Sequence, residues 1–292
     1  MTGLMKKTIL YIAFVPSLFL LSCNKTTEDT TSCDAITLNV SLPVTKATAS
    51  AFESGDALSL FAVERDGETQ LPLQISGNFI NNEKFTCDGS SWASSRTLYW
   101  SSSACDFYAI YPYQARITSI DNQAFDLVLD QSADGYEASD LMYASALNRS
   151  RGDGAVPLQF RHMMSKCKVV LVKGAEFEGD IPDDAVVHIY NTVTTAQIDF
   201  TKGSLQKAPM GERGTITMKK TDNTHFEAIV VPQFIESRTP LVEITMGGIA
   251  YLLEYSISFR PGYSQTLQIT LNTSPDQEMI EINIDAGTED WN

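Results

Sequence analysis

Short segments in which apolar and polar residues alternate recur along the chain. The clearest is 36–42, where even-numbered residues are apolar and odd-numbered ones polar, so that an extended strand presents one apolar face. Comparable runs lie at 58–63, 107–113, 125–129, 169–172, 186–190, 226–231, 242–246, 249–257, 267–271 and 280–284. Turn signals such as Asp66-Gly67 and Pro261-Gly262 separate them. No window carries a sustained helical stripe, so the pattern predicts an all-β chain of antiparallel β-sandwiches.

A polar, glycine-rich stretch at 148–155 separates two structured blocks and is the best internal boundary. We therefore predict two sandwiches of roughly 100–140 residues, the usual size of a domain. The N-terminal sandwich is expected at 47–155. The C-terminal sandwich is expected at 156–292 and includes the terminal strand.

The chain begins with the pattern of a bacterial lipoprotein signal. Lys6 and Lys7 precede an apolar run at 8–21, and small Ser22 stands directly before Cys23. The run is short, like the h-region of a signal peptide rather than a membrane span. We predict a signal peptide at 1–22 and lipidation of Cys23, which would tether the protein to the outer membrane through acyl chains. The alternatives are an ordinary signal peptide or a transmembrane anchor.

The charge balance argues against nucleic acid as a partner. Asp and Glu outnumber Lys and Arg by 36 to 21, for a net charge of -15, and loss of Lys6 and Lys7 with the signal leaves -17. Such an acidic body repels phosphate backbones. Apolar residues make up 43% of the chain, which is typical of a folded protein.

Four cysteines follow Cys23, at Cys33, Cys87, Cys105 and Cys167. Their spacing matches no zinc pattern. In an oxidising compartment they allow three pairings, and the pair Cys87–Cys105 is favoured because the two lie close in sequence. Four buried free thiols are the alternative.

The sequence contains no recognisable catalytic constellation. His162, His188 and His225 lie in separate segments without partners at metal-ligand spacing. We expect a packed, hydrogen-bonded role for His162 and a solvent-facing one for His188. A Ser-x-x-Lys match at 204–207 lacks its companion motifs, and nucleotide-binding and hydrolase motifs are missing. We therefore predict no enzyme, no metal and no cofactor.

An Arg-Gly-Asp tripeptide and a group of aromatic residues could each be a binding site, but each also has a simpler explanation. The tripeptide Arg151-Gly152-Asp153 is one that some adhesion receptors read, although a three-residue match is mostly coincidence. Trp92, Trp100 and the aromatic residues at 111–113 could form a sugar-binding platform. Aromatic residues on strands more often fill a sandwich core.

Several blocks stand in a characteristic order: Phe52–Ala62, Trp92 with Tyr99 and Trp100, Phe107–Tyr113, Asp140–Ala144, Leu158–Lys166, Val231–Gln233, Phe259–Tyr263 and Ile284–Trp291. In this order they resemble the fimbrillin family of Bacteroidales, the Mfa-like group of type V pilin subunits. The blocks cover nearly all of the chain after the signal.

The resemblance implies two tandem transthyretin-like sandwiches and a defined route of assembly. Family members reach the outer membrane as lipoproteins, a trypsin-like protease removes a short N-terminal segment, and the subunits polymerise by strand exchange. Cleavage in the family usually follows Arg, whereas the matching position here is Lys46, before Ala47. Residues 23–46 would then be a lipidated tether and first strand that is removed in a shaft subunit and retained in an anchor subunit.

The residues themselves fit such an exchange. Removing the strand at 36–42 would expose an apolar groove and unpaired backbone groups, which a strand from a neighbouring subunit can fill. Ile280, Ile282 and Ile284 alternate with polar residues near the chain end and form the predicted assembly strand.

We therefore predict a structural shaft or anchor subunit of a surface fimbria that supports cell adhesion. Its partners would be other fimbrial subunits, the outer membrane through the lipid, and a host or bacterial surface ligand. The competing prediction is a monomeric surface lipoprotein that binds glycans.

Overall fold

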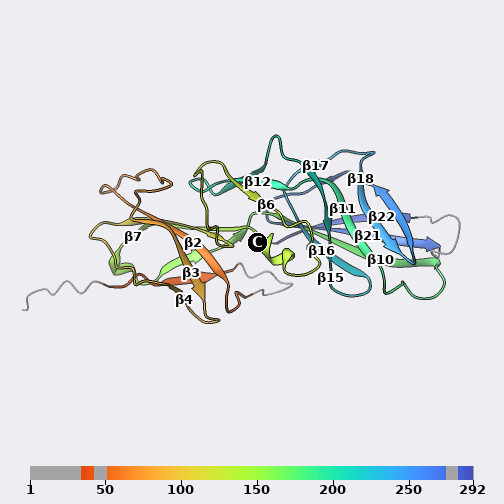
Figure 1. Ribbon diagram of the computed structural model, residues 1–292, viewed down its shortest axis with the longest axis horizontal. Coiled ribbons are helices and arrows are strands. Elements are labelled where there is room, and N and C mark those ends of the chain that lie inside the picture. Colours follow the sequence, from red (N-terminus) through yellow and green to blue (C-terminus); the bar gives the residue numbers. More distant parts are fainter. Residues whose placement is uncertain (1–33, 43–50, 274–281, 292) are drawn as a thin grey trace, which may run out of the picture. The chain divides into compact units, whose positions relative to one another are not determined.

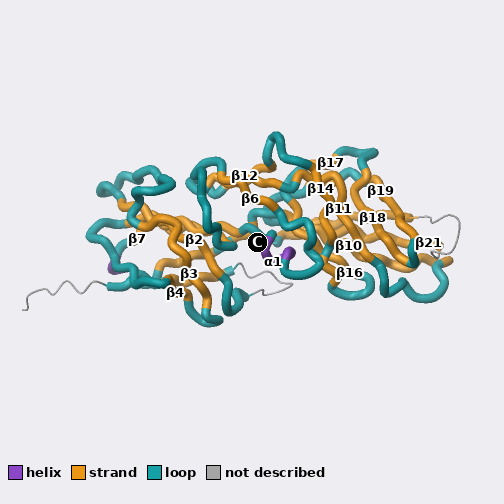
Figure 2. Tube along the Cα trace, viewed as in Figure 1, coloured by secondary structure: helices purple, strands orange, loops and turns teal. Residues whose placement is uncertain are grey.

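The computed structural model describes residues 34–42, 51–273 and 282–291. They form an all-β structure, as predicted from the alternation (Figures 1 and 2). The helical elements among these residues are one turn of α-helix, α1 (Gly135–Ala138), and one 3-10 turn, η1 (Arg151–Asp153). Neither is long and apolar enough to cross a membrane.

A six-stranded antiparallel sheet contains most of the first half of the chain. Its order is β4 (Trp92–Ser94), β3 (Ile80–Cys87), β2 (Ala57–Glu64), β5 (Cys105–Tyr111), β7 (Met142–Arg149) and β9 (Arg161–His162). Both faces of β2 are buried, because Leu58 and Leu60 pack into one hydrophobic cluster and Phe61 and Val63 into another. This explains why β2 is apolar on both faces from Leu60 to Val63 rather than alternating.

Two further sheets enclose the core of the second half. One has the order β15 (Lys219–Lys220), β16 (His225–Val230), β10 (Ser165–Glu176), β21 (Tyr263–Thr273) and β22 (Ile282–Asp290). The other has the order β14 (Arg213–Thr217), β11 (Val186–Val193), β18 (Pro240–Met246) and β19 (Ile249–Glu254). Most pairs are antiparallel, whereas β10 and β21 run parallel. The buried side of β10 includes Cys167, Val169 and Leu171.

Three small sheets complete the fold. β13 (Ser204–Lys207), β12 (Thr195–Asp199) and β6 (Gln123–Asp126) form one, β17 (Phe234–Ile235) and β20 (Ile257–Ser258) the second, and β1 (Leu38–Ser41) and β8 (Val156–Gln159) the third. The pairing of β6 with β12 links segments from the two halves of the sequence. The division at residues 155 and 156 stays a prediction.

The turn between β12 and β13 packs against the six-stranded sheet. The hydroxyl of Tyr143 on β7 donates to the carbonyl oxygen of Phe200 at 2.7 Å, and the ring of Phe200 lies 5.9 Å from that of Phe61. Gly203 has φ +58°, and a Cβ there would stand 2.3 Å from the Tyr143 ring. Glycine therefore permits both the backbone conformation and the close approach.

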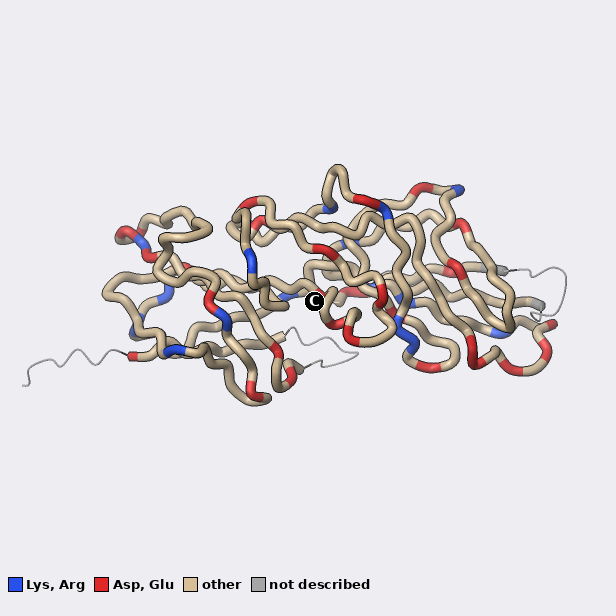
Figure 3. Tube along the Cα trace, viewed as in Figure 1, with Lys and Arg blue, Asp and Glu red and all other residues tan. Residues whose placement is uncertain are grey.

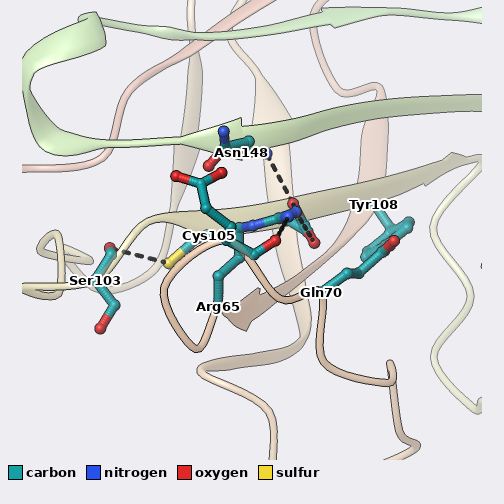
Figure 4. Close-up of polar contacts among 8 residues, drawn as sticks. Arg65, Gln70, Ser103, Cys105, Tyr108 and Asn148 are labelled. Atoms are coloured by element: carbon teal, nitrogen blue, oxygen red, sulfur yellow. Dashed lines mark hydrogen bonds and ion pairs between the residues drawn. The ribbon is translucent and has the colours of Figure 1, made fainter.

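Charged residues are interspersed along the described chain (Figure 3), and one pair is buried in the first half. Asp106 on β5 has a side chain that is 0% exposed, and both of its carboxylate oxygens accept from Arg65 Nη1, at 2.8 and 2.9 Å (Figure 4). The backbone N–H of Asn148 donates to the same carboxylate at 2.7 Å. These three donor contacts satisfy a charge that would otherwise be costly to bury.

Candidate functional site: the first and last strands

The first strand is seated in the core of the first half. Ile36 is 6% exposed, and Leu38, Val40 and Leu42 are half-buried against the cluster that contains Leu58 and Leu60. The intervening polar side chains are exposed. The alternation in this segment thus places its apolar face inward, and burying Ile36 alone contributes about 1.5–3 kcal/mol.

The main-chain partner of β1 is β8, which lies more than a hundred residues later in the sequence. The two strands run parallel, with Leu38 opposite Val156 and Ser41 opposite Gln159. The N–H of Val156 donates to the Thr37 carbonyl at 2.8 Å. Among the described strands, β8 pairs with β1 alone. Loss of β1 would therefore leave β8, which buries Val156 and Leu158, without its sheet partner.

Residues just before β1 join a different segment. The N–H of Ile36 donates to the carbonyl of Leu98 at 2.8 Å, and the N–H of Trp100 donates to the carbonyl of Asp34 at 3.0 Å. The Asp34 carboxylate also accepts from Arg151 Nε at 2.8 Å. The N-terminal segment is thus held by two separate parts of the first half.

The last strand, β22, lies at the edge of the five-stranded sheet. It pairs antiparallel with β21 over its whole length, from Ile282 opposite Leu271 to Asp290 opposite Tyr263. The side chain of Ile284 packs against the core of the second half, and the side chains at 285–290 are exposed. Its other edge has no strand partner among the described residues.

Several predicted site residues lie outside the described residues. These are the lipidation site Cys23, the processing site Lys46 with Ala47, and Ile280 of the assembly strand. For Ile282 the structure describes the backbone, which pairs with β21. Ile284 is thus the predicted assembly residue whose side-chain packing is described. The roles assigned to all of these residues stay predictions.

The favoured disulfide between Cys87 and Cys105 does not form. Both thiols are free and buried, as is Cys167. Cys87 stands beside Asp56, and Cys105 pairs with Glu64. Asp56 and Glu64 lie at opposite ends of β2. At 3.3 Å per residue, these two ends are about 25 Å apart, and so are the two cysteines beside them. A disulfide needs Cα atoms within about 7 Å, so closeness in sequence was a poor guide. Cys33 lies outside the described residues.

His162 is packed and hydrogen-bonded, as expected. Its side chain is buried, its Nδ1 lies 2.9 Å from Asp140 Oδ1, and its ring stacks on that of Trp291 at 3.7 Å. The prediction that His188 faces solvent is correct only in part, because its side chain is 25% exposed and lies 3.5 Å from Glu243. In residues 34–42, 51–273 and 282–291, no group of three or more His, Cys, Asp or Glu side chains is arranged to hold a metal ion.

Three of the four aromatic residues considered for a sugar platform, Trp92, Trp100 and Tyr111, pack against the core instead. The ring of the fourth, Tyr113, lies 5.3 Å from Lys84 Nζ. The rings of Trp92 and Tyr111 both contact Phe52, at 5.1 and 5.3 Å, and Trp100 lies edge-on to Phe107 at 5.5 Å. Trp92, Trp100 and Tyr111 all belong to the packing around the first-half cluster. They therefore do not form a free aromatic surface.

The Arg-Gly-Asp tripeptide forms η1 and its charged groups already have partners. The Asp153 carboxylate accepts from the N–H of Ser150 at 2.7 Å and lies 3.8 Å from Arg149. The hydrogen bond from Ser150 is the main cause that lowers the pKa of Asp153. Arg151 is paired with Asp34, so this turn is built into the fold.

Two functional features escaped the sequence reasoning. One is the role of β8 as partner of the first strand, for which the only sequence signal is the short alternation of Val156 and Leu158 with polar neighbours. The other is the environment of Trp291, whose ring contacts His162 and lies 4.5 Å from Lys166 Nζ. Neither could be found from local periodicity, because both depend on segments that are distant in sequence.

The strand arrangement and the sequence agree on the class of protein. A model of the fimbrillin-like family matches residues 45–291, and the chain belongs to this family. A relative in Bacteroides ovatus, named "Putative fimbrium tip subunit Fim1C", is 35% identical over 137 residues. That match spans 42% of this chain and 24% of the relative.

Solved structures share the fold. A "putative cell adhesion protein" from Bacteroides uniformis matches with a TM-score of 0.65 and 21% identity, over 88% of this chain and 98% of its own. A second, from Bacteroides ovatus, matches with a TM-score of 0.67 and 16% identity, over 89% and 98%. A fimbrial protein from Bacteroides ovatus matches with a TM-score of 0.51 and 20% identity, over 83% of this chain and 51% of its own.

Proposed function

We propose that this protein is a structural subunit of a surface fimbria that supports cell adhesion. It is exported as a lipoprotein through acylation of Cys23 and assembles by strand exchange with other fimbrial subunits. Its body consists of two tandem transthyretin-like sandwiches, at 47–155 and 156–292, and performs no catalysis. Membership of the fimbrillin-like family and the fold shared with cell adhesion proteins support this proposal.

The observation that carries the proposal is the way β1 packs into the core of the first half. Its apolar face fills the first-half core, its main-chain partner is β8, and the processing site Lys46 follows it in the sequence. Cleavage after Lys46 would separate this strand from the body. The vacated groove would then expose apolar side chains and the unpaired edge of β8, a surface that an extended strand can complete.

The strand that enters this groove carries Ile280, Ile282 and Ile284 of a neighbouring subunit. Burying three Ile side chains contributes roughly 5–9 kcal/mol at about 1.5–3 kcal/mol each. Association costs of at least about 4 kcal/mol oppose this gain, and backbone pairing with β8 of the neighbour replaces the ladder with β21 that the strand leaves. The net stability of the joint is therefore the difference between the packing of this strand in the neighbour and in its own subunit, where Ile284 already contacts the core.

Limited trypsin digestion of a Cys23→Ala chain tests the proposal, because that variant can be purified without lipid. We expect a stable product that begins at Ala47 and then forms a ladder of multimers on size-exclusion chromatography. The matched control Lys46→Gln should stay uncut at this site and monomeric. A product that begins at Ala47 and remains monomeric at high concentration would contradict strand exchange. If surface protein still begins at Cys23, the subunit is an anchor rather than a shaft component.

A further inference from the structure

Trp291 at the end of the last strand joins three parts of the chain. Its ring stacks on the ring of His162, with centroids 3.7 Å apart and planes 10° apart. Lys166 Nζ lies 4.5 Å from the centroid of the same ring, and the N–H of Trp291 donates to the carbonyl of Gly262 at 2.9 Å. His162 belongs to β9 of the six-stranded sheet, and Lys166 belongs to β10 of the five-stranded sheet. The end of β22 is therefore attached to elements other than its strand partner β21.

The rest of β22 has much weaker side-chain attachment. The side chains at 285–290 are exposed, and Glu289 contacts β10 through Lys168 at 2.6 Å. Ile284 packs against the core at the other end. An edge strand that is held mainly by its backbone pairing frays from its ends, and Trp291 stands at the C-terminal end of β22.

His162, the residue on which the Trp291 ring stacks, is held by a contact of its own. The Nδ1 atom of His162 lies 2.9 Å from Asp140 Oδ1. Lys166 is half-buried, and desolvation lowers its pKa, against an opposing effect of Glu227. The carboxylate of Glu227 in turn accepts from the Tyr136 hydroxyl at 3.0 Å. The indole thus enters a preorganised site, so binding it requires little further ordering.

We propose that Trp291 is a latch that holds β22 in its own subunit, and that the latch must open before the strand can be donated to a neighbour. This inference rests on the proposed role of the last strand in assembly. While the indole is bound, β22 cannot separate from β21 at its C-terminal end. Once the indole leaves, the edge strand keeps its ladder with β21, the packing of Ile284 and polar contacts near the solvent such as Glu289 with Lys168.

Hydrogen–deuterium exchange of the purified, uncleaved Cys23→Ala chain tests the latch without assembly. Trp291→Ala should exchange roughly 10- to 100-fold faster along β22 and its partner amides on β21, the factor expected for losing an aromatic stack and a cation–π contact. Trp291→Phe should recover most of the protection. Asp285→Ala, an exposed change on the same strand, should match the parent. Unchanged exchange in Trp291→Ala, or faster exchange throughout the chain, would overturn the proposal.

A second variant tests the release of β22 from its own subunit without changing how β22 would pack in a neighbouring subunit. His162→Ala removes one wall of the latch and leaves the sequence of the donated strand unchanged. After trypsin activation it should form multimers faster than the parent, with the same final size distribution. Equal rates for parent and variant would overturn the latch. If the cleaved parent forms no multimers at all, the strand-exchange proposal fails instead. The hydrogen–deuterium exchange measurement then decides by itself whether Trp291 retains β22.

Discussion

Replacing Asp106 by alanine should strongly destabilise the first half of the chain. The carboxylate is fully buried and accepts from Arg65 and from the N–H of Asn148. Its removal leaves the Arg65 guanidinium, only 12% exposed, without its counter-charge. Breaking a buried pair in this way costs about 3–5 kcal/mol. Arg65→Met should cost a similar amount, because it leaves the carboxylate uncompensated.

The double variant distinguishes a paired charge from simple loss of packing. With both charges removed, the main remaining defect is the unpaired N–H of Asn148, which costs about 1–3 kcal/mol. The double variant should therefore be far less destabilised than the sum of the single changes. We expect a coupling free energy of at least about 2 kcal/mol between Asp106 and Arg65.

Urea denaturation followed by tryptophan fluorescence measures these free energies on the Cys23→Ala chain. Arg96→Ala is the matched control, because Arg96 is 64% exposed and pairs with Glu83 at 3.0 Å. An ion pair whose cation is this exposed contributes about 0–1 kcal/mol. If the single effects of Asp106→Ala and Arg65→Met simply add, the two side chains do not act as a pair and the reasoning is refuted.

Three other predictions follow from burial. Desolvation raises the pKa of the Cys105 and Cys167 thiols to about 12, so iodoacetamide at pH 8 should modify them only after unfolding, as peptide mass spectrometry will show. Burial raises the pKa of the Tyr143 phenol from 10.0 to about 12. The protonated phenol therefore contributes up to roughly 3 kcal/mol to the free energy of unfolding below pH 10, and this contribution is lost as the pH rises through 12. Tyr143→Phe should remove this fall in stability between pH 10 and 12. Phe200→Ala should cost about 3–5 kcal/mol in urea denaturation, because the ring is 1% exposed between the sheets.

Strands with a regular pattern could be recognised before the structure was known. The segment 36–42 buries its apolar face and exposes its polar side chains, so its sequence period matches the pleat. In β10, burial alternates from Ser165 to Leu171, although the second face is half-buried rather than exposed. β3 was missed because Asn81, Asn82, Glu83 and Lys84 interrupt its apolar pattern. That strand is stabilised by pairing with β2 on one side and β4 on the other, which no local signal contains.

The first and last strands were therefore predictable as strands, while their attachments were not. Nothing near Leu38 indicates parallel pairing with β8, and nothing near Trp291 indicates a stack on His162. The wrong guess about Cys87 and Cys105 has the same origin, since the strand β2 between them in the sheet holds them apart.

The amino-acid sequence by itself determined the all-β class, the inward face of the first strand and the order of blocks that marks the family. These depend on side-chain type at a local period of two. Only the tertiary structure decided which strands pair and which residues meet at the chain end. Backbone N–H and C=O groups are alike at every position, so a strand's partner is selected by the fit of the whole core rather than by the strand's own residues.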